Sequence, residues 1–308
     1  MAYGLFTSTV VKSPFFDMEG MYNTLMDRMR NYSSVFSRAV FSNIIKFQDV
    51  TPIDAVGKTY DSDLLQKDTM SYLDYLAKMY DALKVHYRCE YVYKNIVVNQ
   101  LLRTYAGPNT VILNEFHVGD SVADIVLFNG NSRAYEIKTD LDTPRRLSSQ
   151  LDTYTHFFQE TYIVIPESLY DEYLAIVDGN IGIIVLEGCG KRLKLAKYRE
   201  ATENSSIDFD ILKRTLRIPE YEGIVRSYYS SLPDVGYYEM YDACWDQISK
   251  IPNSELIQSI NTVIKKRKNN TLFLNHYEQY LRQMCLAMNV NEKQYSQLYS
   301  TLCKQVVF

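Results

Sequence analysis

The stretch SVADIVLFNGNSRAYEIKTDLD, residues 121–142, decides how the middle of this chain folds. Two apolar runs, typical of strands, flank a short turn rich in Asn and Gly. Asp124 lies inside the first run, and the second run ends with Glu136, Ile137 and Lys138. Because a charge is costly to bury without a partner, charged residues inside such strands indicate a site.

The length of the turn decides whether these charges meet. A two-residue loop would direct Asp124 and Glu136 to opposite sides of the hairpin. A three-residue loop, residues 129–131, sets Asp124 directly opposite Glu136, with Cβ atoms about 4.5–5.5 Å apart. Lys138 shares the face of Glu136, because residues two apart in a strand point the same way. A shared site therefore needs an odd-length loop or a bulge, and three-residue hairpins are common.

The chemistry of such a site follows from its residue types. Two neighbouring carboxylates repel each other unless a cation lies between them. An oxygen-rich pair suits Mg²⁺ or Mn²⁺, which also take water and phosphate oxygens as ligands. A lysine beside them can position water and stabilise charge that develops on phosphorus. These are the parts needed for metal-assisted hydrolysis of a phosphodiester, and a solvated ion pair at a strand end is the alternative.

The surrounding sequence predicts an α/β core. An amphipathic helix precedes the sheet, and short turns predict an antiparallel meander. Thr143-Pro144 predicts the start of the next helix. The predicted order is helix 88–105, strands 111–118, 121–128 and 132–139, helix 144–160, strand 161–166, helix 166–178, strand 181–187, and an edge strand or extended arm at 191–201.

Helical patterns flank this core on both sides. We divide the chain into a helical N-terminal region, residues 1–85, a core, residues 86–200, and a helical C-terminal region, residues 201–308. TPIDAVGKT, residues 51–59, predicts a loop between two long N-terminal helices. The basic run at 265–268 ends a predicted helix and is expected to be a solvated cap or a DNA contact.

Composition narrows the classes of function. The net charge of −4 over 308 residues means that any polyanion must meet a local basic patch. The five cysteines are dispersed without a CxxC pair, which argues against a disulfide framework and a zinc site. We find no secretion signal and no apolar run near the roughly 20 residues that span a bilayer. We therefore expect a cytoplasmic protein without membrane contact.

The segment from 88 to 166 resembles the PD-(D/E)XK (restriction-endonuclease-like) nuclease superfamily, whose core runs αβββαβ. The motif is carried by Asp124, eleven intervening residues, and then Glu136-Ile137-Lys138. Ala123 replaces the proline that often precedes the first acid in this family. The match is to a branch of small, uncharacterised bacterial proteins and covers about eighty residues.

The resemblance assigns roles to these residues. It implies that Asp124, Glu136 and the carbonyl of Ile137 ligate Mg²⁺ or Mn²⁺, and that Lys138 positions the attacking water. Glu90, on the helix before the sheet, is implied as a further metal or water contact. An ion pair with Lys94, four residues along the same helix, is the alternative role for Glu90.

Further positions of the family pattern lie on the helix after the lysine strand. Gln150 and Tyr154 match them, and the resemblance implies contacts to metal-bound water or to the DNA backbone. For Gln150 the alternative is a polar rim residue, and for Tyr154 it is core packing. The phosphate contacts are expected from two basic pairs, Arg145 with Arg146, and Lys191 with Arg192.

These observations predict a Mg²⁺-dependent phosphodiesterase, an endonuclease with DNA as the expected substrate. The family setting implies a role in bacterial defence against phage or other foreign DNA, or in repair. The alternative is a catalytically silent module of the same fold that binds nucleic acid or protein. The Tyr-rich C-terminal helices are the expected docking surface for a second copy or for a partner protein.

Overall fold

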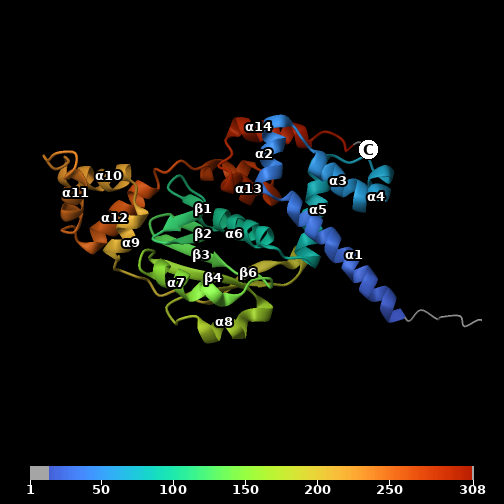
Figure 1. Cartoon of the computed structure of the whole chain (residues 1–308), viewed down its shortest axis with the longest axis horizontal. Coiled ribbons are helices and arrows are strands. Elements are labelled where there is room, and N and C mark those ends of the chain that lie inside the picture. Colours follow the sequence, from blue (N-terminus) through green and yellow to red (C-terminus); the bar gives the residue numbers. More distant parts are fainter. Residues whose placement is uncertain (1–13, 307–308) are drawn as a thin grey trace, which may run out of the picture.

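The computed structural model describes residues 14–306, and its centre is a six-stranded mixed sheet in the order β1-β2-β3-β4-β5-β6 (Figure 1). The first three strands form an antiparallel meander, β4 and β5 are added in parallel, and β6 is antiparallel again. The strands are β1 (Val111–Val118), β2 (Ser121–Phe128), β3 (Ser132–Ile137), β4 (Glu160–Pro166), β5 (Gly182–Glu187) and β6 (Lys194–Arg199). The predicted α/β class with a mixed sheet is confirmed.

One face of the sheet packs against a helix that crosses it and against helices from both ends of the chain. Their apolar side chains form one continuous core with this face of the sheet. The helices on this side are α1 (Pro14–Val35), α2 (Arg38–Phe47), α3 (Thr51–Tyr60), α4 (Ser62–Lys67), α5 (Tyr72–His86), α6 (Glu90–Tyr105), α13 (Arg282–Ala287) and α14 (Glu292–Leu302).

The other face carries a second core, in which aromatic rings from the sheet and its helices pack together. The helices on this side are α7 (Leu147–Thr155), α8 (Tyr170–Ile176), α9 (Phe209–Thr215), α10 (Ile218–Tyr229), α11 (Met240–Ile248) and α12 (Asn253–Ile264). The predicted C-terminal region is therefore divided between the two faces of the sheet. Its first four helices pack on one side and its last two on the other.

Short 3₁₀ segments connect several of these elements. They are η1 (Pro144–Arg146), η2 (Glu167–Leu169), η3 (Gly190–Arg192), η4 (Thr271–His276) and η5 (Gln279–Leu281). The helix predicted over 144–160 thus begins as η1, and its α-helical part ends at Thr155. Phe157 and Phe158 leave the helix and enter the core, which explains the early end.

The predicted loop at 51–59 is wrong, because these residues form α3. Pro52 occupies the first turn, where a missing N–H costs nothing, and the Asp49 carboxylate accepts a hydrogen bond from the Thr51 N–H at 3.0 Å. Ile53 and Val56 are then buried on one side of the helix. Residues 1–13 of the predicted N-terminal region lie outside the described residues.

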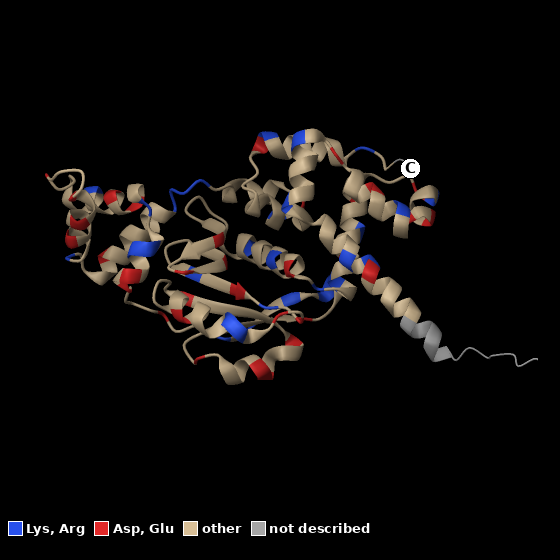
Figure 2. Ribbon diagram, in the orientation of Figure 1, with Lys and Arg blue, Asp and Glu red and all other residues tan. Residues whose placement is uncertain are grey.

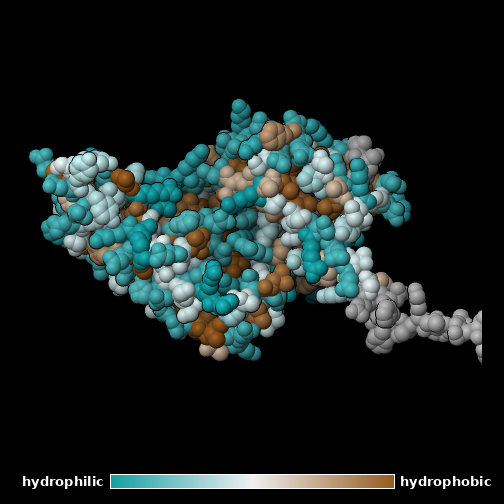
Figure 3. Space-filling model, in the orientation of Figure 1, coloured by the Kyte–Doolittle hydropathy of each residue, from teal (hydrophilic) through white to brown (hydrophobic). Residues whose placement is uncertain are grey.

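The surface is polar and its charges are mixed. Acidic and basic residues are spread over all parts of the fold (Figure 2), and hydrophilic residues dominate the face seen in Figure 3. Within residues 14–306, each helix is too short or too polar to cross a bilayer.

Candidate active site

The β2–β3 hairpin has the register that brings the two acids together. Phe128 pairs with Ser132, so the loop has three residues, which is the length that a shared site requires. The same register, continued one step past the last regular pair, sets Asp124 opposite Glu136. The strands part at this point. The Asp124 Oδ2 accepts a hydrogen bond from the Ile137 N–H at 2.9 Å, in place of a β2 carbonyl.

Glu136 is a buried acid held at both oxygens. Its side chain is only 3% exposed, with Oε1 2.9 Å from the Lys138 Nζ. Its Oε2 lies 3.0 Å from the Tyr154 hydroxyl. Burial raises the pKa of Glu136, and the charge of Asp124 raises it further, while Lys138 and Tyr154 act in the opposite direction. A cation near these acids would therefore stabilise the ionised form.

Helix α7 supplies the side chains that hold this pair. The Gln150 Oε1 lies 3.4 Å from the Lys138 Nζ, and Tyr154 sits one turn later. The Tyr154 hydroxyl is also 2.7 Å from the Val122 carbonyl, and its ring packs edge-on against Phe158. The ring of Tyr154 belongs to the core, which is its alternative role, while its hydroxyl contacts Glu136.

Lys94 is a site residue that sequence reasoning missed. Its side chain on α6 is 7% exposed, and its Nζ lies 2.8 Å from the Asp124 Oδ1 and also pairs with Glu90. Burial would lower the pKa of Lys94, but the carboxylates of Asp124 and Glu90 raise it to about 12. The one sequence signal for Lys94 was its position four residues after Glu90 on the same helix, and that spacing indicated only an ion pair at the helix surface.

The position of Glu90 follows from this pair. Its side chain is 62% exposed and its carboxylate is directed at Lys94. Glu90 and Lys94 border a pocket of about 430 Å³ that Arg38 and Glu115 also line. Glu115 is held by Arg38 at 2.7 Å, so it stays outside the acidic pair.

The site lies at the end of the sheet, where side chains from helices on both faces reach the same strands. Lys94 approaches from α6 on one face, and Tyr154 approaches from α7 on the other. Asp124, Glu136 and the Ile137 carbonyl supply the oxygen ligands that suit Mg²⁺. Among residues 14–306, no three His, Cys, Asp or Glu side chains gather closely enough to hold a metal together. With two carboxylates and one carbonyl as its protein ligands, a bound Mg²⁺ would need water or phosphate oxygens for the rest of its coordination.

The predicted phosphate contacts lie in two separate places. Arg145 and Arg146 are exposed in η1, which leads directly into α7 and its site residues. Lys191 and Arg192 are exposed in η3, which packs against α5. Arg145 and Arg146 therefore precede the helix whose Gln150 and Tyr154 contact the acids' site. Lys191 instead lines a different pocket.

Comparison with known proteins places this fold in a family. The chain belongs to the family described as Bacteriophage P4 protein cII, which it matches over residues 83–288. The matched span includes the whole sheet and Glu90, Lys94, Asp124, Glu136, Lys138, Gln150 and Tyr154.

Two individual proteins are similar to the chain. Protein cII of Enterobacteria phage P4 is 27% identical over 108 residues, which are 34% of this chain and 36% of that protein. The chain therefore matches about a third of that relative's length. A solved structure of a protein of unknown function from Silicibacter pomeroyi covers 48% of this chain and 94% of its own, with 10% identity and a TM-score of 0.31. A likeness of that size carries no argument about function.

Proposed function

We propose that this chain is a metal-dependent nuclease of the PD-(D/E)XK kind, with a restriction-endonuclease-like core and DNA as its substrate. The observation that carries the proposal is the convergence of Asp124, Glu136 and Lys138 where β2 and β3 part. Gln150 and Tyr154 from α7 meet them there. Polar side chains that converge on a buried acid with a raised pKa are typical of functional sites.

A divalent metal held by Asp124, Glu136 and the Ile137 carbonyl would supply Lewis-acid stabilisation and acidify a bound water. The chain's own groups do the positioning. The Lys138 ammonium, 2.9 Å from the Glu136 Oε1, has further N–H groups for the attacking water or a phosphate oxygen. Gln150 fixes the direction of Lys138, and the Tyr154 hydroxyl holds the second oxygen of Glu136.

The substrate proposal rests on charge beside the site. Arg145 and Arg146 are exposed immediately before α7, where they can contact the phosphates that flank the scissile bond. Guanidinium groups bind phosphate oxygens in pairs, which suits a backbone contact without sequence reading. The relative named above is a phage protein, and this supports a setting in conflict between phages and bacteria over one in repair.

A catalytically silent module that binds nucleic acid or protein is the second candidate. One observation favours it, namely that both carboxylates are already neutralised by lysines. Lys94 pairs with Asp124, and Lys138 pairs with Glu136. A chain that never takes a metal could keep this arrangement as a structural network.

Cleavage assays decide between the two. Supercoiled, linear and single-stranded DNA, and RNA, would be incubated with Mg²⁺, Mn²⁺ or EDTA. The wild type would be compared with Lys138→Ala, and with Lys293→Ala as an exposed control on α14. We expect metal-dependent cutting of DNA that falls at least a hundredfold in Lys138→Ala and is unchanged in the control. If the wild type cleaves none of these substrates and Mg²⁺ does not change its melting temperature, the catalytically silent module is the better account.

A further inference from the structure

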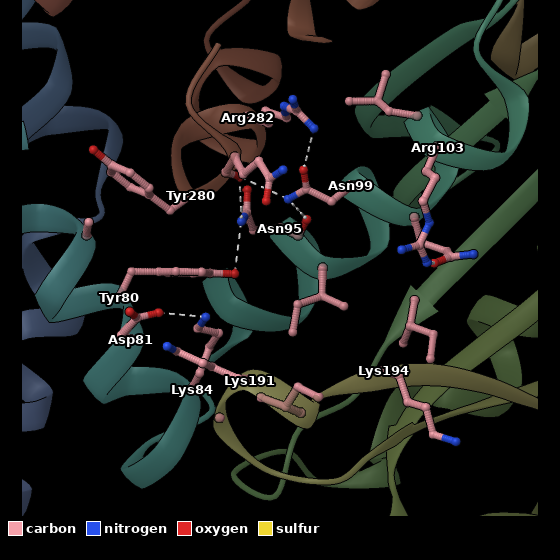
Figure 4. Close-up of a pocket in the computed structure, with 18 of the residues that line it drawn as sticks. Tyr80, Asp81, Lys84, Asn95, Asn99, Arg103, Lys191, Lys194, Tyr280 and Arg282 are labelled. Atoms are coloured by element: carbon pink, nitrogen blue, oxygen red, sulfur yellow. Dashed lines mark hydrogen bonds and ion pairs between the residues drawn. The ribbon is translucent and has the colours of Figure 1, made fainter. Parts of the chain in front are cut away.

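A second pocket, of about 800 Å³, lies away from the acids and shares none of its lining residues with them. Its walls come from α5, from the later turns of α6, from the η3–β6 segment, and from the chain around η4 and η5 (Figure 4). These segments are far apart in the sequence, so the pocket exists only in the folded protein. Its volume is in the range of about 300–1,000 Å³ that is usual for small-molecule sites.

The charge of this pocket is one-sided. Its lining holds one carboxylate, Asp81, against a larger set of cations. The cations are Lys84, Arg103, Lys191, Lys194 and Arg282. Such clustering is unusual in a chain of net charge −4, because like charges held together repel. A bound anion would relieve that repulsion.

The cations come from different walls, and Lys194 pairs with Glu187 at 3.1 Å outside the lining, so Lys84, Arg103, Lys191 and Arg282 are the ones that define the pocket's charge. Lys84 and Lys191 lie together beside Asp81, and Arg103 and Arg282 lie on the other side in Figure 4. Lys84 pairs with Asp81 at 2.7 Å, and Asn99 holds Arg282 at 2.8 Å. A small anion such as one phosphate would meet only one or two of these groups. A ligand with several linked phosphates can meet them together.

The rest of the lining suits a planar group. Tyr80 and Tyr280 place their rings 6.3 Å apart on one wall. The Asn95 amide donates to the Tyr80 hydroxyl at 2.9 Å, and Asn99 and Gln100 follow along α6. Tyr80 is 6% exposed, and the Asn95 and Asn99 amides already hydrogen-bond within the protein, so the half-buried Tyr280 ring is the surface on which a nucleobase can stack.

We propose that this pocket binds a nucleoside di- or triphosphate, with its phosphates on Lys84, Lys191 and Arg103 and its base toward Tyr280. This adds a small-ligand site to the proposed nuclease and does not depend on it. Lys191, expected from the sequence to contact nucleic acid, is thereby assigned to a walled pocket of small-molecule size. A regulatory nucleotide at this position would also brace α5 against α6.

Isothermal titration of the full chain in EDTA tests the site without any nuclease chemistry. The probes are ATP, ADP, AMP, inorganic tripolyphosphate and a twelve-residue oligothymidylate. We expect ATP to bind more tightly than ADP, and ADP more tightly than AMP. The double variant Arg103→Glu/Lys191→Glu should weaken ATP binding at least tenfold, since it reverses two exposed charges. Lys78→Glu/Lys293→Glu, a matched reversal of exposed lysines elsewhere, should leave ATP binding within twofold.

Several results would overturn the proposal. Absence of binding by all phosphorylated probes would exclude the site. ATP affinity that is equal in the wild type and in Arg103→Glu/Lys191→Glu would place binding elsewhere. Tripolyphosphate binding as tightly as ATP would refute the nucleoside part. Oligothymidylate that binds more tightly than ATP, and loses that binding in Arg103→Glu/Lys191→Glu, would show that the pocket takes a nucleic-acid strand instead. Lys138→Ala should bind ATP like the wild type, which separates this site from the proposed nuclease.

Discussion

Replacing Lys94 by methionine removes the ammonium that neutralises Asp124 while keeping a chain of similar length. The pKa of Lys94 rises from 10.5 to about 12, so its carboxylate contacts outweigh its burial. At about 1.36 kcal/mol per pKa unit, this difference corresponds to roughly 2 kcal/mol. A raised lysine pKa contributes its full stability below 10.5 and loses it only as the pH climbs toward 12. At pH 7.5 the whole contribution is therefore at stake.

Urea unfolding at pH 7.5 in EDTA measures this effect. We expect Lys94→Met to lower the free energy of unfolding by about 2 kcal/mol, because Asp124 and Glu90 lose their shared cation. Lys78→Met, an exposed lysine on α5, is the matched control and should change stability by less than about 0.5 kcal/mol.

Adding Mg²⁺ then tests the link to the proposed metal site. If Lys94 serves as the counter-ion of Asp124 in the metal-free protein, Mg²⁺ should stabilise Lys94→Met more than it stabilises the wild type. A change in Lys94→Met no larger than that in Lys78→Met would refute the account of a buried counter-ion. Equal Mg²⁺ responses of Lys94→Met and the wild type would separate Lys94 from the metal site.

Three further predictions concern stability. The pKa of Glu136 is raised in the folded protein, so the wild type should lose stability relative to Glu136→Gln as the pH rises above 4.5. Urea unfolding midpoints of the two proteins that differ by the same amount at every pH would contradict this prediction. Arg267→Met should cost about 3–5 kcal/mol by leaving Glu220 buried without its partner at 2.6 Å, and a loss below about 1 kcal/mol in urea would argue against this. Gly182→Ala should destabilise the protein by about 1–3 kcal/mol and lower its melting temperature, because the added Cβ would lie 2.3 Å from the Tyr162 ring. An unchanged melting temperature would show that the ring can move aside without cost.

Local pattern was sufficient to predict the centre of the fold. The period of two in the strands, the turn chemistry around Gly130 and the length of the loop are properties of neighbouring residues. From them two possible registers could be stated in advance, and the structure has the one with a three-residue loop, which sets Asp124 opposite Glu136. The helix that carries Gln150 and Tyr154 could be predicted for the same reason, since its spacing and its Thr-Pro start are local.

Long-range packing decided the rest. Residues 51–59 resemble a loop locally but become helical because Ile53 and Val56 find a core to enter. Arg267, in a basic run that predicted a solvated end or a DNA contact, pairs with Glu220 47 residues away and lies over the Phe116 ring.

The same holds for the two candidate sites. Lys94 meets Asp124 only because α6 crosses the sheet, and the cations of the second pocket are joined only by folding. The amino-acid sequence by itself placed the two acids on neighbouring strands of one hairpin, within the two registers that its turn allows. Tertiary structure determined which cations reach them, because that depends on contacts between segments that no local pattern encodes.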